Sequence, residues 1–180
     1  MVRLKALSPE EATGKTKELF HAILSKFGVI PNMMKTMGNS AAFLEGYLNF
    51  SSALNGGSLG AKTSALIALA VSEINACQYC LAAHTYVGAT YGNLDEETMK
   101  AARLGKSKNA KTDAILKFAQ TLVIERGRIS DSDIELLKTA GVTEGELAEI
   151  VGHVALNILT NYFNIMANTE FDFPSAASSN

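Results

Sequence analysis

One stretch organises this chain of 180 residues, and it contains both of its cysteines. Residues 68–84 read Ala-Leu-Ala-Val-Ser-Glu-Ile-Asn-Ala-Cys-Gln-Tyr-Cys-Leu-Ala-Ala-His. Residues three and four apart share one face of an α-helix, so Cys77, Cys80 and His84 are expected on a single stripe. The apolar run that precedes them favours a buried helix. We expect a bend at Asn75 and Ala76, before the helix that carries the thiols.

The spacing of the two thiols favours redox chemistry. Cβ atoms at positions i and i+3 of a helix are about 5–6 Å apart, so a modest adjustment in a first turn would let Cys77 and Cys80 bridge. We therefore predict a reversible intramolecular disulfide between them. The imidazole of His84, one turn beyond Cys80, is placed to take the thiol proton or to stabilise the thiolate.

Other interpretations of the same residues stay open. The two cysteines could be buried structural thiols, because cysteine often behaves as a small core hydrophobe. A zinc site would draw three ligands from Cys77, Cys80 and His84, although His21 and His153 are far away in sequence. Covalent haem attachment is excluded, because it requires a histidine directly after the second cysteine, where this chain has Leu81.

Helix signals cover nearly the whole chain, and no stretch shows sustained period-two alternation. We predict an all-α fold. The Gly-rich loop at 55–60 is expected to connect two helices, because its spacing does not fit a phosphate-binding loop. An all-α fold also excludes thioredoxin, which needs a βαβ context. The expected helices span about 8–26, 31–37, 40–54, 59–75, 95–104, 107–126 and 130–140. The helix that carries the thiols is expected to end near residue 91, and a last long helix to begin at 143.

The last helix carries a polar stripe within apolar surroundings. His153, Asn157 and Asn161 follow one another at steps of four and therefore share a face. We interpret the stripe as a set of hydrogen bonds across a helix or subunit contact. A position near the thiols is the open alternative.

Composition indicates one domain of ordinary globular character. With 47% hydrophobic residues, the chain is long enough to bury a sizeable core, and we expect a single domain at 1–174 followed by a disordered tail at 175–180. The net charge is −2 and the basic residues are scattered, so we expect no nucleic-acid and no membrane partner. The absence of an apolar leader favours a cytoplasmic location, where two cysteines are not a structural staple.

A homo-oligomer is also expected. The segment 59–75 is apolar on nearly all sides, and the last helix has an apolar face, which together exceed what a chain of this size easily buries alone.

Residues 68–84 resemble the core of the alkylhydroperoxidase AhpD-like, or carboxymuconolactone decarboxylase, family. Residues 154–164 and the run Phe-Asp-Phe-Pro at 171–174 are similar to the carboxyl end of its peroxidase-related branch. The resemblance implies an AhpD-like helical domain and a peroxidase-like oxidoreductase that needs no metal and no cofactor. It further implies a small hydroperoxide as substrate, a dithiol or protein as reductant, and assembly into trimers or hexamers.

The resemblance also implies a role for each site residue. Cys80 would react with the peroxide, Cys77 would resolve it, and His84 would relay protons. Many family members have a relay Glu twelve residues before the first cysteine, where this chain has Ala65. We expect Glu73, the nearest upstream carboxylate, to orient His84 instead, which would raise the imidazole pKa and favour the Cys80 thiolate. A solvated surface Glu73 is the alternative.

The leading functional hypothesis is therefore a thiol-dependent, alkylhydroperoxidase-like antioxidant enzyme with peroxiredoxin activity. A carboxymuconolactone decarboxylase-like enzyme is one alternative, although nothing in the sequence marks a site for an anionic lactone. A non-catalytic, redox-responsive helical oligomer is the other.

Overall fold

The computed structural model describes residues 1–176, and within them it shows nine α-helices and no strand. The prediction of a single all-α domain is confirmed. The helices are α1 (Gly14–Phe27), α2 (Asn32–Met37), α3 (Ala41–Asn55), α4 (Gly60–Ile74), α5 (Gln78–Thr90), α6 (Glu96–Arg103), α7 (Ala110–Ile124), α8 (Asp131–Thr139) and α9 (Glu144–Ala167).

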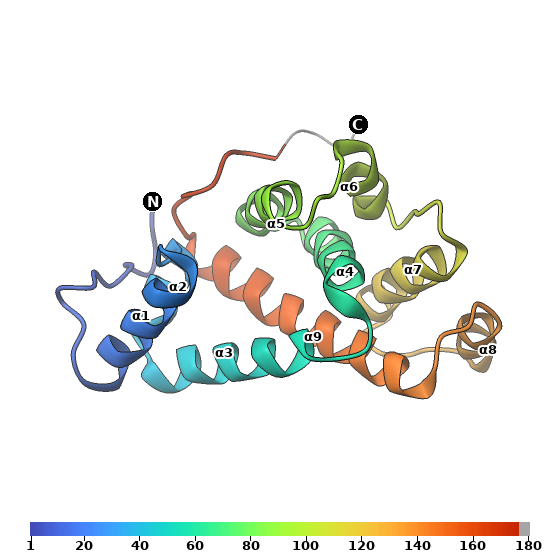
Figure 1. Ribbon diagram of the computed structural model, residues 1–180, viewed down its shortest axis with the longest axis horizontal. Coiled ribbons are helices and arrows are strands. Elements are labelled where there is room, and N and C mark those ends of the chain that lie inside the picture. Colours follow the sequence, from blue (N-terminus) through green and yellow to red (C-terminus); the bar gives the residue numbers. More distant parts are fainter. Residues whose placement is uncertain (177–180) are drawn as a thin grey trace.

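Helix α4 lies at the centre of the fold. Its residues 66–72 are all buried, and α5, α6, α7 and α9 pack around it (Figure 1). Leu69 and Val71 are completely inaccessible to solvent. Because the surrounding helices belong to the same chain, the monomer itself accounts for the all-round apolarity of this segment. That apolarity is therefore no longer a reason to expect an oligomer.

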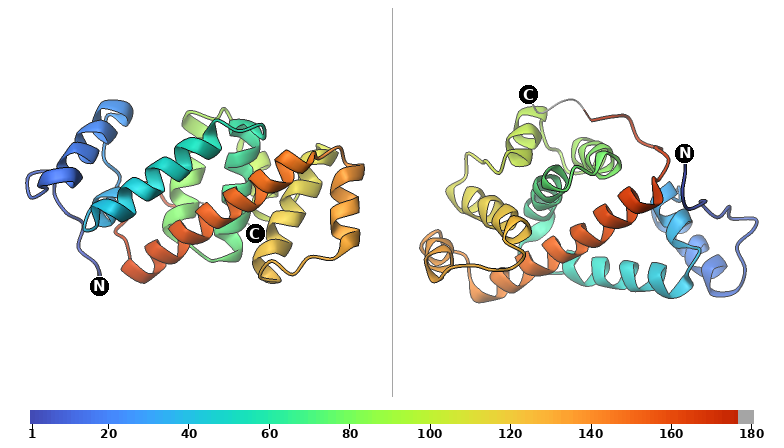
Figure 2. Two further views of the ribbon diagram at one scale, coloured as in Figure 1. Left: turned by 90° about the horizontal axis from the view of Figure 1, so that it is seen from below. Right: turned by 180° about the vertical axis from the view of Figure 1, so that it is seen from behind.

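The long helix α9 crosses the whole molecule and joins its two cores. It packs on α4, α5 and α7 on one side and on α3 on the other, so the small α1–α2–α3 group is attached to the central core through it (Figure 2). Phe20, Met37 and Leu44 fill that second core.

The outer face of α9 remains apolar and exposed, with Val151, Tyr162, Ile165 and Met166 accessible to solvent. The homo-oligomer stays a prediction that this face favours. By length and composition α9 could also span a membrane, but half of its most apolar window is buried inside the fold.

Local capping signals set most helix starts where the sequence predicted them. Ser40, Asp95, Ser130 and Thr143 each accept a hydrogen bond from the third residue of the helix that follows, and the last two form capping boxes. At the start of α4 the carboxylate of Glu149 accepts hydrogen bonds from the backbone of Ser58 and Leu59.

Two predicted helix starts are wrong. Ser8 and Glu11 exchange hydrogen bonds and close a single turn, after which Thr13 is extended and Gly14 has a φ of 51°, so α1 begins only at Gly14. Helix α7 begins at Ala110 rather than near Ser107, because the side chain of Asn109 caps it.

The chain after α9 runs back along the molecule, past α2 and α5 and toward α6 (Figure 1). Ala176 packs against the central core. The prediction of a disordered tail at 175–180 falls largely on residues 177–180, which lie outside the described residues.

The central position of α4 generates a stability prediction. Leu69→Ala removes a fully buried side chain and should lower the free energy of unfolding by about 2–5 kcal/mol in urea denaturation at pH 7. Leu136→Ala is the matched control, because this leucine is 66% exposed and its loss should change stability by less than about 0.5 kcal/mol. Equal losses in the two variants would contradict the described core.

Candidate active site

A tight bend between α4 and α5 presents the two cysteines. Ala76 adopts a left-handed conformation with a φ of 53°, its N–H donates to the carbonyl of Glu73, and the N–H of Cys77 donates to the carbonyl of Ser72. These are the two hydrogen bonds of a Schellman motif, which ends a helix and reverses the chain direction. The bend expected at Asn75 and Ala76 is therefore confirmed. Helix α5 starts directly after it.

Cys77 and Cys80 are joined by a disulfide, with Cα atoms 5.3 Å apart. This confirms the predicted pairing, while its reversibility stays a prediction. Cys77 is the cap residue of α5, and its Sγ lies 3.3 Å from the backbone N–H of Cys80, which belongs to the first turn. The amino end of a helix favours negative charge, so this position favours thiolate forms of both residues once the bond is reduced.

Only one of the two sulfur-bearing residues faces open space. A cavity of about 430 Å³ lies between α2, α3, α4, α5 and α9, and Cys80 lines it whereas Cys77 does not. Apolar and aromatic side chains form most of the wall, among them Met33, Tyr79 and Phe173. Its described lining includes no Asp, Glu, Lys or Arg. A small apolar molecule that entered this space would meet Cys80.

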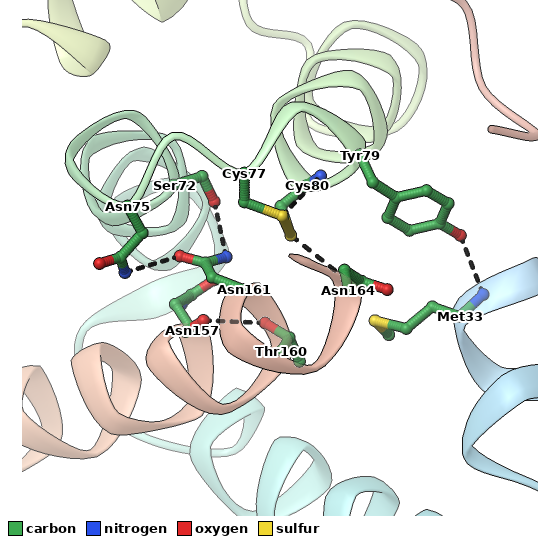
Figure 3. The surroundings of a disulfide bond; sticks show 10 residues. All are labelled: Met33, Ser72, Asn75, Cys77, Tyr79, Cys80, Asn157, Thr160, Asn161 and Asn164. Carbon is green, nitrogen blue, oxygen red and sulfur yellow. Dashed lines mark hydrogen bonds between the residues drawn. A yellow bond between two sulfur atoms is a disulfide. The ribbon is translucent and has the colours of Figure 1, made fainter. Parts of the chain in front are cut away.

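The polar stripe of α9 serves both of the purposes considered for it. Asn161 is completely buried, donates to Ser72 Oγ at 3.2 Å and accepts from Asn75 Nδ2 at 2.9 Å, so it ties α9 to the bend (Figure 3). His153 lies 3.1 Å from Ser64 on α4. Asn157 lines the cavity, so the stripe also reaches the thiol site.

One site residue was absent from the sequence-based prediction. Asn164 is buried on α9, lines the cavity and donates from Nδ2 to Cys80 Sγ at 3.4 Å (Figure 3). It lies three residues after Asn161 and thus continues the stripe around the helix. A search for steps of three as well as four would have found it.

Comparison with known proteins gives a family match for the middle of this chain and a fold match for the whole of it. The model of the carboxymuconolactone decarboxylase family matches residues 41–121, from α3 into α7, a segment that includes both cysteines and His84. The same fold occurs in a solved structure described as an AhpD core and an uncharacterized peroxidase-related protein from Ralstonia eutropha JMP134 (TM-score 0.85, 19% identity, 95% of this chain and 92% of that chain). Residues 41–121 of this chain therefore match the carboxymuconolactone decarboxylase family, and the chain as a whole shares the fold of that AhpD-core structure.

Two further structures share the fold. An uncharacterized peroxidase-related protein from Silicibacter sp. TM1040 aligns with a TM-score of 0.82 at 21% identity, over 94% of this chain and 91% of that one. A debrominase solved in complex with 2,3,4-tribromopyrrole aligns with a TM-score of 0.78 at 17% identity, over the same two shares. No curated protein sequence matches the chain.

His84 lies half-buried at the cavity wall and is hydrogen-bonded to the side chain of Asn157. Burial lowers its pKa to about 4, and the hydrogen bond to Asn157 opposes this shift only in part. The imidazole is therefore neutral at pH 7 when the disulfide is formed. The prediction that its pKa is raised is wrong, because the surroundings desolvate the ring and the bond to Asn157 is a neutral one.

The carboxylate of Glu73 lies against Arg103 of α6, with Oε2 2.7 Å from Nε. The catalytic role of Glu73 stays a prediction, and the structure gives its carboxylate a structural partner on α6. Ala65, at the position of the relay Glu in many AhpD-like proteins, lines the cavity. The family position thus faces the site, and in this chain it supplies a methyl group instead of a charge.

The chain after α9 closes one side of the site. Phe173 packs edge-on against Tyr79 and at a tilt against Tyr86, while Phe171 also contacts Tyr79. Asp172 accepts a hydrogen bond from the backbone N–H of Asn32 at 2.6 Å. The Phe-Asp-Phe-Pro run that resembled the peroxidase-related branch therefore contributes Phe173 to the cavity wall.

Among the described residues, no further side chain completes a zinc site with Cys77, Cys80 and His84. Within residues 1–176, no group of three or more His, Cys, Asp and Glu side chains is placed to hold a metal ion. Cys77 and Cys80 are consumed by their mutual bond in this state.

The buried neutral histidine makes stability depend on pH. The folded pKa of His84 is about 4 and its unfolded pKa is about 6.5, so the unfolded chain binds more protons between these values. His84 therefore costs the folded state up to about 1.4 kcal/mol per pH unit as the pH falls through this window. In urea denaturation of the oxidised protein at pH 7, 6, 5 and 4, His84→Gln should flatten the loss of stability.

His21→Gln is the matched control, because His21 is exposed on α1. It should leave the slope unchanged. A slope that is the same in wild type and His84→Gln would contradict the neutral, desolvated state of the ring.

Proposed function

We propose that this protein is a thiol-dependent peroxidase that reduces organic hydroperoxides through a Cys80–Cys77 redox cycle. The observation that supports it most strongly is the placement of Cys80. Of the two bonded cysteines, Cys80 lines the cavity and lies in the first turn of α5, whereas Cys77 does neither. Its disulfide partner is already within bonding distance, so oxidation and resolution need no large movement of the chain.

In the first step the Cys80 sulfur attacks the terminal oxygen of R–O–O–H. A sulfur–oxygen bond forms and the oxygen–oxygen bond breaks, so Cys80 becomes a sulfenic acid and the alkoxide leaves. The thiol proton passes to the alkoxide, which departs as an alcohol. In the second step Cys77 attacks the sulfenic sulfur and water leaves, which gives the disulfide seen here. An external dithiol then returns both thiols and is itself oxidised.

His84 is the side chain that we assign to proton transfer. It lies one turn after Cys80, so the two face the same side of α5. A neutral imidazole accepts the thiol proton, and its lowered pKa makes the resulting imidazolium a good acid toward the alkoxide. This is a different role from a permanent positive charge that holds the thiolate.

The alternatives receive less support from the site. A decarboxylase acting on an anionic lactone would need a cation for the substrate carboxylate, and the described cavity wall offers none. A debrominase shares the fold, and its apolar aromatic ligand would suit an uncharged cavity. That reaction is therefore a second candidate for the same sulfur. A homo-oligomer and a cytoplasmic location remain part of the proposal.

The proposal predicts distinct consequences for the two cysteines. With dithiothreitol as reductant, wild type should turn over cumene hydroperoxide in steady state. Cys80→Ser should fall to the uncatalysed background, because the attacking sulfur is gone. Cys77→Ser should react once in stopped flow and stop at a sulfenic acid that dimedone traps on Cys80 and mass spectrometry identifies.

Ser8→Ala in the amino-terminal turn is a control that should keep wild-type turnover. Absence of peroxide consumption by the reduced wild type, or trapping of the sulfenic acid on Cys77 in Cys80→Ser, would overturn the assigned chemistry.

A further inference from the structure

The amide oxygen of Asn164 is a buried acceptor that no described group satisfies. Asn164 is only 3% exposed, and its Nδ2 is committed to Cys80 Sγ at 3.4 Å, which leaves Oδ1 without a donor. In Figure 3 this oxygen points away from the sulfur and toward the side of the cavity where Tyr79 and Met33 lie. Buried polar atoms in proteins are almost always paired, so an orphan beside a reactive sulfur indicates a ligand contact.

The neighbouring donors are committed elsewhere. The hydroxyl of Tyr79 accepts from the N–H of Met33 at 3.1 Å and is hydrogen-bonded to the carboxylate of Asp172. Thr160 donates to the carbonyl of Asn157 at 3.1 Å, and Asn157 donates to the carbonyl of His153 at 2.8 Å. None of these side chains has its proton directed to Asn164. The described residues therefore leave this oxygen open to a donor from a molecule that enters the cavity.

The two ends of the amide define where that donor lies. The nitrogen and oxygen of one carboxamide are held in a fixed relation, so a group bonded to Oδ1 is separated from the sulfur by no more than the amide itself and the two contacts that the amide makes. In a hydroperoxide the terminal oxygen carries the proton that can be donated, and the same oxygen is the atom that the sulfur attacks. Asn164 can therefore hold that atom in the same part of the cavity as the sulfur.

The rest of the cavity selects against charge. Its described wall carries no ionisable side chain other than two histidines, the two tyrosines at positions 47 and 79, Tyr91 and Cys80, and burial lowers the pKa of both histidines. A carboxylate taken into this space would lose its water without gaining a cation.

We propose that Asn164 is a specificity-determining residue, whose amide oxygen receives the O–H of the substrate beside Cys80 and whose uncharged surroundings restrict that substrate to neutral organic hydroperoxides. The proposal rests on the peroxidase function for the identity of the reaction. Its binding part is independent of turnover, because the acceptor is present in the disulfide form.

Three unreactive analogues test the binding part on the oxidised protein by ligand-observed NMR titration. 2-Phenyl-2-propanol is the alcohol that forms when cumene hydroperoxide is reduced, and it keeps an O–H donor. Its methyl ether lacks this donor. In 2-hydroxy-2-phenylpropanoate a carboxylate replaces one methyl group of the alcohol. We expect the alcohol to bind roughly tenfold more tightly than the ether, as one hydrogen bond to a buried acceptor gives. The carboxylate should bind at least about tenfold more weakly than the alcohol.

Asn164→Leu should bring the alcohol-to-ether ratio to about one, whereas Thr160→Val, whose hydroxyl is used on Asn157, should keep it. If Asn164→Leu does not fold, the three affinities of the wild type decide the question alone. Equal binding of alcohol and ether, binding of the carboxylate as tight as that of the alcohol, or no binding of any analogue overturns the inference even if peroxide turnover is present. Discrimination without turnover supports the recognition site and overturns the peroxidase function.

Discussion

The buried amide of Asn161 is the interaction on which the site depends. It accepts from Asn75 and donates to Ser72, and so holds the end of α4, directly before the bend, against the middle of α9. The bend makes Cys77 the cap of α5 and puts Cys80 in its first turn. The completely buried position of Asn161 means that loss of either hydrogen bond would leave an unpaired polar group, at a cost of about 1–3 kcal/mol.

The described cavity wall has no carboxylate beside His84. Proton relays in enzymes often use a carboxylate to raise the pKa of a histidine, and here Ala65 stands where many AhpD-like proteins have one. The cavity is left neutral, and the pKa of His84 falls to about 4. Stabilisation of negative charge on Cys80 then comes from the start of α5 and from the amide of Asn164, neither of which changes its charge with pH. Such a site depends on dipoles and shape more than on ion pairs.

The fold was predictable to the extent that its signals are local. Capping residues such as Thr143 and the i, i+3 cysteines act within one turn of chain, and these elements lie where the sequence placed them. The start of α1 was missed because Ser8 to Glu11 does form a turn, which Thr13 and Gly14 then interrupt. The partner of Glu73 depends on which helix packs beside α4, and the pKa of His84 depends on the polarity of a cavity built from five helices. Sequence spacing carries neither piece of information.

We propose that the start of α5 and the amide of Asn164 activate Cys80 without a permanent ionic partner. The most direct test is the rate of iodoacetamide alkylation of Cys80 in reduced Cys77→Ser, measured from pH 4 to pH 10. We expect the rate to reach its plateau below about pH 7, with a midpoint well under the value of about 8.5 that is usual for a free thiol. A rate that keeps rising beyond about pH 8.5 would contradict it, because Cys80 would then be an ordinary buried thiol.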